Sequence, residues 1–104
     1  MHITLERAMD GLFSFMSDQV STIANMGERF LGYAVVGALK KNPAPLMSKI
    51  KSWLEMAGVL NDGMVDLDVL KAALDSAFAA VPRVSYLGFS FTVEDATALL
   101  AKMQ

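Results

Sequence analysis

The chain has 104 residues, a formal net charge of −2 and no cysteine. That length suits one domain with a single core, and the lack of cysteine excludes disulfides, thiolate catalysis and sulfur-ligated metals. The acidic balance gives no electrostatic reason to bind nucleic acid or an anionic membrane surface.

Residues 3–41 form a long stretch with helical spacing before the first proline. Large apolar side chains recur at three- and four-residue steps, at Leu5, Met9, Leu12, Met16, Val20, Ile23 and Phe30. This spacing is typical of a helix, with Thr4 placed to cap it. A continuous helix would be about 55 Å long, longer than a small domain is wide. Because Asn25 and Gly27 are poor helix formers, we expect a break or bend near Gly27, and the pattern leaves open whether the stretch is one helix or two.

The same stretch carries the residues that we expect to meet a partner. Its apolar row continues to Ala34 and Ala38, and the small residues Gly32 and Gly37 lie beside them. Small side chains let another helix approach closely, although ordinary core packing would use them equally well. The interface candidates are Met16, Val20, Ile23, Phe30, Ala34 and Ala38. Residues 1–42 are thus predicted to serve packing or oligomerisation.

A second helix is expected between Pro43 and Gly58. Lys40 and Lys41 are typical of the last turn of the preceding helix, and Pro45 suits the first turn of the next. The apolar side of this helix would contain Leu46, Ile50, Trp53, Leu54 and Ala57. Glycine favours the conformation that ends a helix, so Gly58 should close it.

A turn and a third helix follow. Asn61, Asp62 and Gly63 predict the turn, after which Met64 and Val65 form a very short extended piece. Residue 66 is an aspartate placed to cap the helix, and Pro82 should stop it.

The segment from Arg83 to Thr92 is predicted to be extended, because β-branched and aromatic residues replace the alanine-rich helical composition. It is either a hairpin with a type II turn at Leu87 and Gly88, or one strand bulged at Gly88. A lone hairpin is marginally stable, so residues 64–65 should add a strand or the helices should cover it. Thr92 and Asp95 then begin the last helix by a near capping box.

The elements together predict an α+β fold that is mainly α, in a single domain over residues 1–104. It should have four to five helices and a small two- to three-stranded antiparallel sheet near the C-terminus. Residues 43–104 would form a helix-helix-hairpin-helix unit. No internal repeat or linker divides the chain.

Side chains that commonly perform catalysis or hold metals are scarce. The only histidine is His2, at an end expected to fray, so an ordinary zinc or iron site cannot be assembled within one chain. Asp62, Asp66 and Asp68 offer oxygens to calcium, but the EF-hand register places Val69 where the bidentate glutamate belongs. A turn followed by an acid-rich helix start explains these residues. We therefore expect no enzyme, no cofactor and no metal site.

The apolar content gives the leading functional hypothesis. With glycine counted and tyrosine left out, about 59% of the residues are apolar, against roughly 45–50% in ordinary soluble domains. We therefore expect a non-catalytic interaction or structural module that self-associates as a homo-oligomer or binds another protein.

Two alternatives remain open. One is a carrier of small apolar ligands, with a methionine- and phenylalanine-lined cavity between the helices and the sheet. The other is peripheral membrane association through the amphipathic N-terminal helix, which the acidic balance disfavours. The sequence shows no secretory signal and no apolar run of membrane-spanning length, so we expect a cytoplasmic protein.

Overall fold

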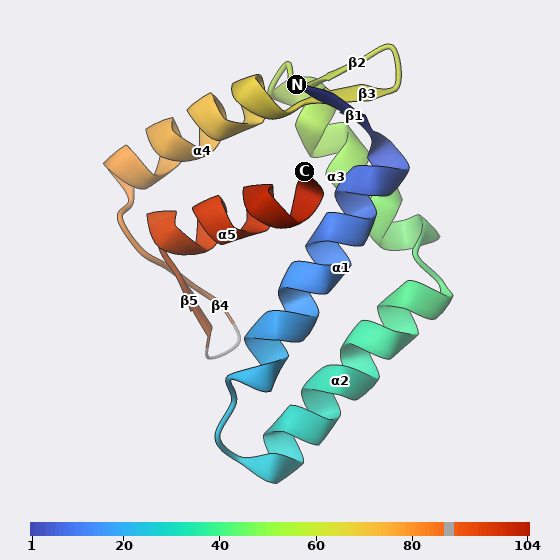
Figure 1. Cartoon of the computed structure of the whole chain (residues 1–104), viewed down its shortest axis with the longest axis vertical. Helices are drawn as coiled ribbons and strands as arrows, with labels where there is room; N and C mark the ends of the chain where they lie inside the picture. Colours follow the sequence, from blue (N-terminus) through green and yellow to red (C-terminus); the bar gives the residue numbers. More distant parts are fainter. Residues whose placement is uncertain (87–88) are drawn as a thin grey trace.

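The computed structural model describes residues 1–86 and 89–104. The elements follow in the order β1 (His2–Thr4), α1 (Leu5–Ser21), α2 (Met26–Lys41), α3 (Ala44–Met56), β2 (Leu60–Asn61), β3 (Met64–Asp66), α4 (Leu67–Ala80), β4 (Val84–Tyr86), β5 (Phe89–Phe91) and α5 (Val93–Met103). Five helices and two small antiparallel sheets in this part of the chain confirm the predicted α+β class, mainly α (Figure 1).

The N-terminal stretch consists of two helices separated by a short connection. Thr4 caps α1 as predicted, and its hydroxyl accepts a hydrogen bond from the Arg7 N–H at 3.1 Å. Asn25 caps α2 in the same way, with its side-chain oxygen 3.0 Å from the Glu28 nitrogen. The predicted break near Gly27 is therefore confirmed. It comprises residues 22–25, and α2 begins at Met26, one residue before that glycine. Ile3, which the spacing groups with this helical stretch, instead lies in β1.

The three-stranded sheet brings the N-terminus beside the middle of the chain. Its order is β1-β3-β2, and Ile3 of β1 lies opposite Val65 of β3. The turn between β2 and β3 has positive φ angles at Asp62 and Gly63, +54° and +76°, a pattern that suits a tight two-residue hairpin. The extended piece predicted at residues 64–65 is present, but it pairs with β1 and β2 and not with the C-terminal hairpin.

The C-terminal hairpin pairs β4 with β5 in antiparallel register, with Val84 opposite Phe91. This confirms the hairpin over the alternative of one bulged strand. The turn predicted at Leu87 and Gly88 lies outside the described residues. Helices cover the hairpin: α5 contacts β5, and the rings of Phe15 in α1 and Phe91 have centroids 6.5 Å apart.

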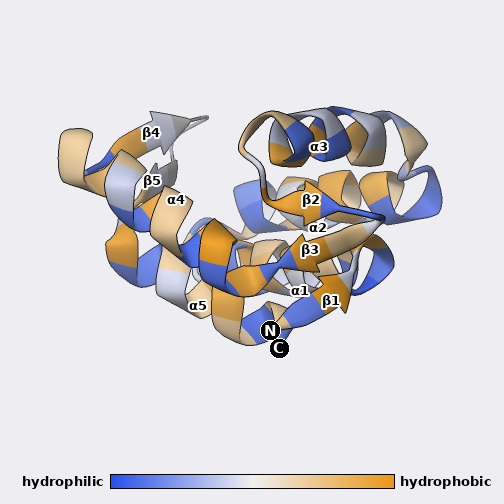
Figure 2. Cartoon of the chain, turned by 90° about the horizontal axis from the view of Figure 1, so that it is seen from above, coloured by the Kyte–Doolittle hydropathy of each residue, from blue (hydrophilic) through white to orange (hydrophobic). Residues whose placement is uncertain are grey.

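The main core lies where the three-stranded sheet meets α1, α4 and α5. Its buried side chains are Ile3, Leu5, Ala8, Val59, Leu60, Val65, Leu67, Leu100 and Met103. The two chain termini lie near each other in both views (Figures 1 and 2), and the Arg7 guanidinium donates to the carbonyl oxygen of Gln104. The α3 helix and the β4–β5 hairpin lie on opposite sides of the molecule (Figure 2).

The helices α1 and α5 approach each other closely at Gly11. A Cβ atom on this glycine would lie 2.7 Å from the Met103 Cγ and 2.8 Å from the Met103 Cα. Carbon atoms do not approach this closely without displacement. The packing of α5 on α1 therefore requires glycine at position 11.

Replacing Gly11 with alanine should destabilise the protein. Alanine favours a helix by about 1 kcal/mol over glycine, but overpacking costs about 1–3 kcal/mol, so we expect a net loss of about 1 kcal/mol in urea unfolding. Gly37→Ala is the matched control, because a Cβ atom on Gly37 would have no neighbouring atom within 4 Å. It should raise stability by up to about 1 kcal/mol at a concentration where the chain is monomeric. Equal gains for both variants would contradict the close contact at Gly11.

Candidate interaction surface

The inner side of α2 packs along α1. Val36 is the one buried residue of α2, and Gly32 faces Val20 of α1, whose Cγ1 would lie 2.9 Å from a Cβ placed on the glycine. Arg29 and Leu39 are half-buried on the same side. Residues 29, 32, 36 and 39 follow helical spacing, so this row defines the inner face of the helix.

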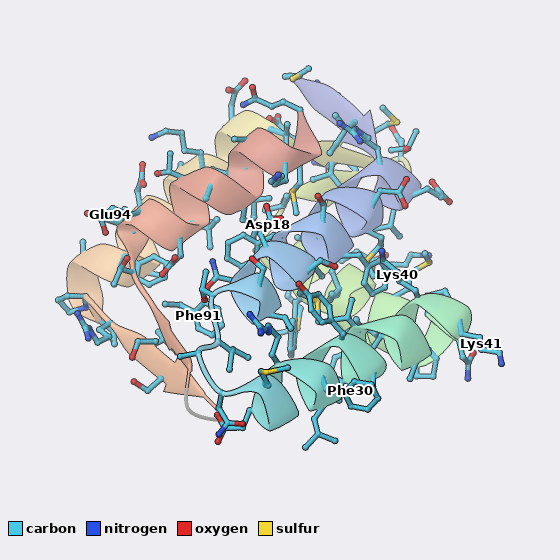
Figure 3. All side chains as sticks on the ribbon, turned by 60° about the horizontal axis from the view of Figure 1, so that its bottom comes forward. Asp18, Phe30, Lys40, Lys41, Phe91 and Glu94 are labelled. Atoms are coloured by element: carbon cyan, nitrogen blue, oxygen red, sulfur yellow. The ribbon has the colours of Figure 1, made fainter. Side chains whose placement is uncertain are left out.

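The side of α2 away from this row, together with its flanks, is largely apolar and exposed. We call this surface the α2 outer face, made of Met26, Gly27, Phe30, Leu31, Tyr33, Ala34, Val35, Gly37 and Ala38. Five of the twelve large apolar side chains exposed among the described residues belong to it, with Met26 at 76%, Phe30 at 74% and Leu31 at 64% exposure. Phe30 points away from the rest of the chain (Figure 3). A helix of a monomeric domain normally places its polar residues on this side, so the outer face resembles a contact surface that lacks its partner.

The predicted interface candidates divide among α1, α2 and the connection between them. Phe30, Ala34 and Ala38 lie on the α2 outer face and are exposed. Val20 is buried within the chain against α2, and Met16 and Ile23 are half-buried. The exposed apolar surface therefore contains the second half of the predicted row. The row also missed four exposed apolar residues of α2, at positions 26, 31, 33 and 35.

Two apolar side chains on another element are also exposed. Trp53 and Met56 of α3 are 59% and 83% exposed. The predicted burial of Trp53 on the apolar side of this helix is therefore wrong, because α3 packs on the core through one narrow side, where Met47 and Leu54 are half-buried.

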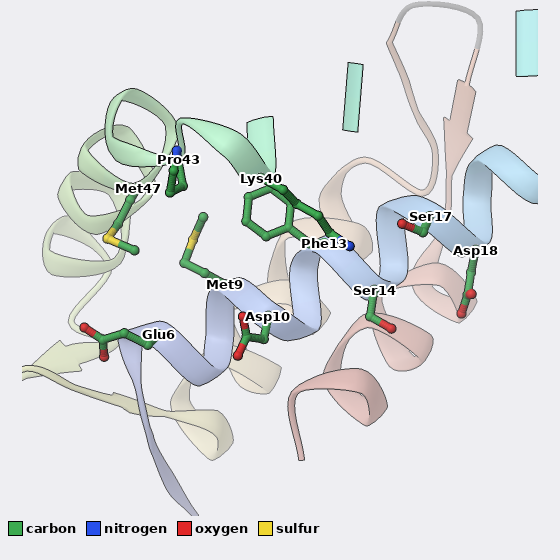
Figure 4. Close-up of a pocket in the computed structure, with 10 residues that line it drawn as sticks. All are labelled: Glu6, Met9, Asp10, Phe13, Ser14, Ser17, Asp18, Lys40, Pro43 and Met47. Carbon is green, nitrogen blue, oxygen red and sulfur yellow. The ribbon is translucent and has the colours of Figure 1, made fainter. Parts of the chain in front are cut away.

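A pocket of about 690 Å³ lies between α1 and the connection from α2 to α3. Its apolar walls are Met9, Phe13, Pro43 and Met47, and its polar walls are Glu6, Asp10, Ser14, Ser17, Asp18 and Lys40 (Figure 4). The Asp18 carboxylate also accepts from the Lys102 ammonium of α5 at 2.8 Å. The pocket thus combines a methionine and phenylalanine surface with three carboxylates.

The acidic residues around the β2–β3 turn have structural roles. The Asp66 Oδ1 caps α4 by accepting from the N–H groups of Asp68 and Val69, at 3.0 and 3.3 Å. Its Oδ2 lies 3.4 Å from the His2 Nε2. The hydrogen bond from the Met1 amino group lowers the pKa of the Asp68 carboxyl group. These contacts explain the cluster as a turn and a helix start, as predicted.

Two further features follow from the described residues. Across residues 1–86 and 89–104, no three histidine, aspartate or glutamate side chains gather as a metal site would require. Within the same residues, none of the helices has both the length and the apolar composition needed to cross a bilayer.

Comparisons with known proteins identify no relative: no protein family, curated protein or solved structure matches this chain. Its function must therefore be inferred from its own surfaces.

The exposure of Phe30 predicts a contrast between two substitutions in α2. Phe30→Ser should change the free energy of unfolding by no more than about 0.5 kcal/mol, because exposed positions contribute little and serine has a similar helix propensity. Val36→Ala should cost about 1–3 kcal/mol, since Val36 is buried against α1. Urea titrations of the monomeric chain measure both. A large loss for Phe30→Ser would mean that its ring is covered within the chain.

Proposed function

We propose that the chain is a non-catalytic module that self-associates through the α2 outer face. The observation that supports this is the concentration of exposed apolar residues on one helix, five large side chains within the 16 residues of α2. Covering apolar surface stabilises a complex by about 25 cal/mol per Å². An aromatic side chain such as Phe30 buries up to about 150–250 Å² when fully covered.

The size of the surface predicts moderate affinity. A helix of 16 residues is about 24 Å long, so a pair of such helices belongs to the small interfaces of less than about 1,200 Å² in total. Association should then depend on concentration over the range accessible to a purified protein. A tight dimer would require additional surfaces next to α2.

A second copy suits this surface because the two ends of α2 carry opposite charges. Glu28 lies in the first turn, and Lys40 and Lys41 lie in the last, and all three are exposed. A helix with opposite charges at its two ends can complement its own copy. We also propose that the protein is cytoplasmic, with which its lack of cysteine agrees.

The test is light scattering coupled to size exclusion over a hundredfold range of protein concentration. We expect a mass that rises from monomer toward dimer or a larger species. Phe30→Asp should keep the chain monomeric, because a charge at the centre of the apolar surface cannot be desolvated cheaply.

Trp53→Asp is the control for this test. It places the same charge at an exposed aromatic position on α3, and it should leave the concentration dependence of the mass unchanged. A monomeric wild-type chain at every concentration, or equal behaviour of the two variants, would contradict the proposal.

The pocket supports a second candidate function, the binding of a small ligand. Met9, Phe13 and Met47 would contact an apolar group, while Glu6 and Asp10 favour a ligand that also carries a positive charge. Native mass spectrometry of the purified chain should then show a retained molecule. The substitution Met47→Arg should abolish its retention by filling the pocket and reducing its net negative charge, and retention that survives this change would place the molecule elsewhere.

A further inference from the structure

The distribution of side-chain size along α2 is uneven. The bulky residues Met26, Phe30, Leu31 and Tyr33 lie in its first half, whereas the second half has Ala34, Gly37 and Ala38, with Val35 as its one bulky residue on the outer face. Two helices pack well when the projections of one fill the depressions of the other. Antiparallel pairing places the bulky half of each copy against the small half of the other. Parallel pairing would place bulky against bulky at one end and leave a gap at the other.

The charges of α2 favour the same direction. Parallel pairing would place Lys40 and Lys41 of one copy beside the same lysines of the other. Antiparallel pairing brings the last turn of each helix to the first turn of its partner, where Glu28 lies. The helix dipoles then also oppose each other, which is the favourable arrangement. Arg29, the other charged residue of the first turn, is half-buried on the inner side of α2.

Spacing along the helix indicates which residues meet. Residues 27, 30, 34 and 38 follow three- and four-residue steps opposite the buried Val36, so they lie along the middle of the outer face, and Lys41 continues this row at the end of the helix. Ala34 is seven residues from Gly27 and seven from Lys41. A twofold axis at Ala34 therefore brings Gly27 of one copy to Lys41 of the other, and small side chains at the axis let the two helices come close.

We infer that two copies of this chain pair through α2 as antiparallel helices, with a twofold axis near Ala34 and with Lys41 of each copy beside Gly27 of the other. This inference rests on the proposed self-association and adds the direction and register of the contact. The interface is isologous, so it closes as a dimer and does not propagate into a filament.

The natural lack of cysteine makes cross-linking the direct test. A disulfide needs Cα atoms about 4.4–6.8 Å apart. In the antiparallel dimer, Ala34→Cys should link to its own copy under mild oxidation. Gly27→Cys and Lys41→Cys should each fail to link alone, because two copies of either residue are about 21 Å apart along the helix. An equimolar mixture of these two variants should link. Non-reducing gels measure the yields, and circular dichroism confirms that each variant folds.

The cross-linking outcomes separate the inference from the proposed function. Self-linking by both Gly27→Cys and Lys41→Cys would show parallel pairing and overturn the antiparallel register. A dimeric mass without disulfide cross-links in any variant would place the contact on another face, and it would also overturn the inferred pairing through α2. A wild-type chain that stays monomeric in light scattering would instead contradict self-association itself.

Charge reversal tests the direction of pairing independently. Glu28→Lys and Lys41→Glu should each raise the dissociation constant by roughly 3- to 10-fold at low salt, since the first turn of each helix lies near the last turn of its partner at both ends of the dimer and exposed charges contribute modestly. The double variant should recover wild-type affinity. The single-variant effects should shrink at high salt, where exposed charges are screened. Single variants without effect, or a double variant that is weaker than either, would contradict the antiparallel direction.

Discussion

The close contact of α1 and α5 at Gly11 is the constraint on which the rest of the arrangement depends. Because a Cβ at this position would collide with the backbone of Met103, the last helix can lie against α1 only where a glycine allows it. The position of α5 then determines the position of β5, which α5 contacts, and of α4, which also packs on it. The ion pair between Lys102 and Asp18 joins the same two helices further along α1.

Features with local causes could be predicted from the sequence. Thr4 and Asp66 cap helices through hydrogen bonds to residues two or three positions ahead, and Gly58 and Gly63 adopt the positive φ angles that glycine tolerates. Each depends on the chemistry of a few neighbouring residues. The α+β class followed from these boundaries together with the change of pattern after residue 82.

Features with distant causes could not be predicted in the same way. Strand β1 has three residues, too few for a periodic signal, and it exists because Ile3 meets Val65 far along the chain. The apolar row of residues 16–38 does not form one stripe, for a related reason. The prediction treated Val20 and Phe30 as one stripe, but the connection between α1 and α2 interrupts the helical phase. The two side chains therefore face in opposite directions, one buried and one exposed.

The packing of α2 explains where the excess apolar composition lies. Its inner face meets α1 through the small Gly32 and a single buried valine, Val36, whereas its largest side chains, among them Phe30 and Leu31, face outward. A helix at the edge of a monomeric domain has the reverse distribution, with its largest apolar residues inside. A helix that lies between two subunits is covered on both sides. Its outer side then needs large and small side chains at positions where the large ones of one copy fit against the small ones of the other. Part of the apolar excess of this chain therefore lies on the surface of α2 and not in the core, which is the observation that supports the proposed intermolecular contact.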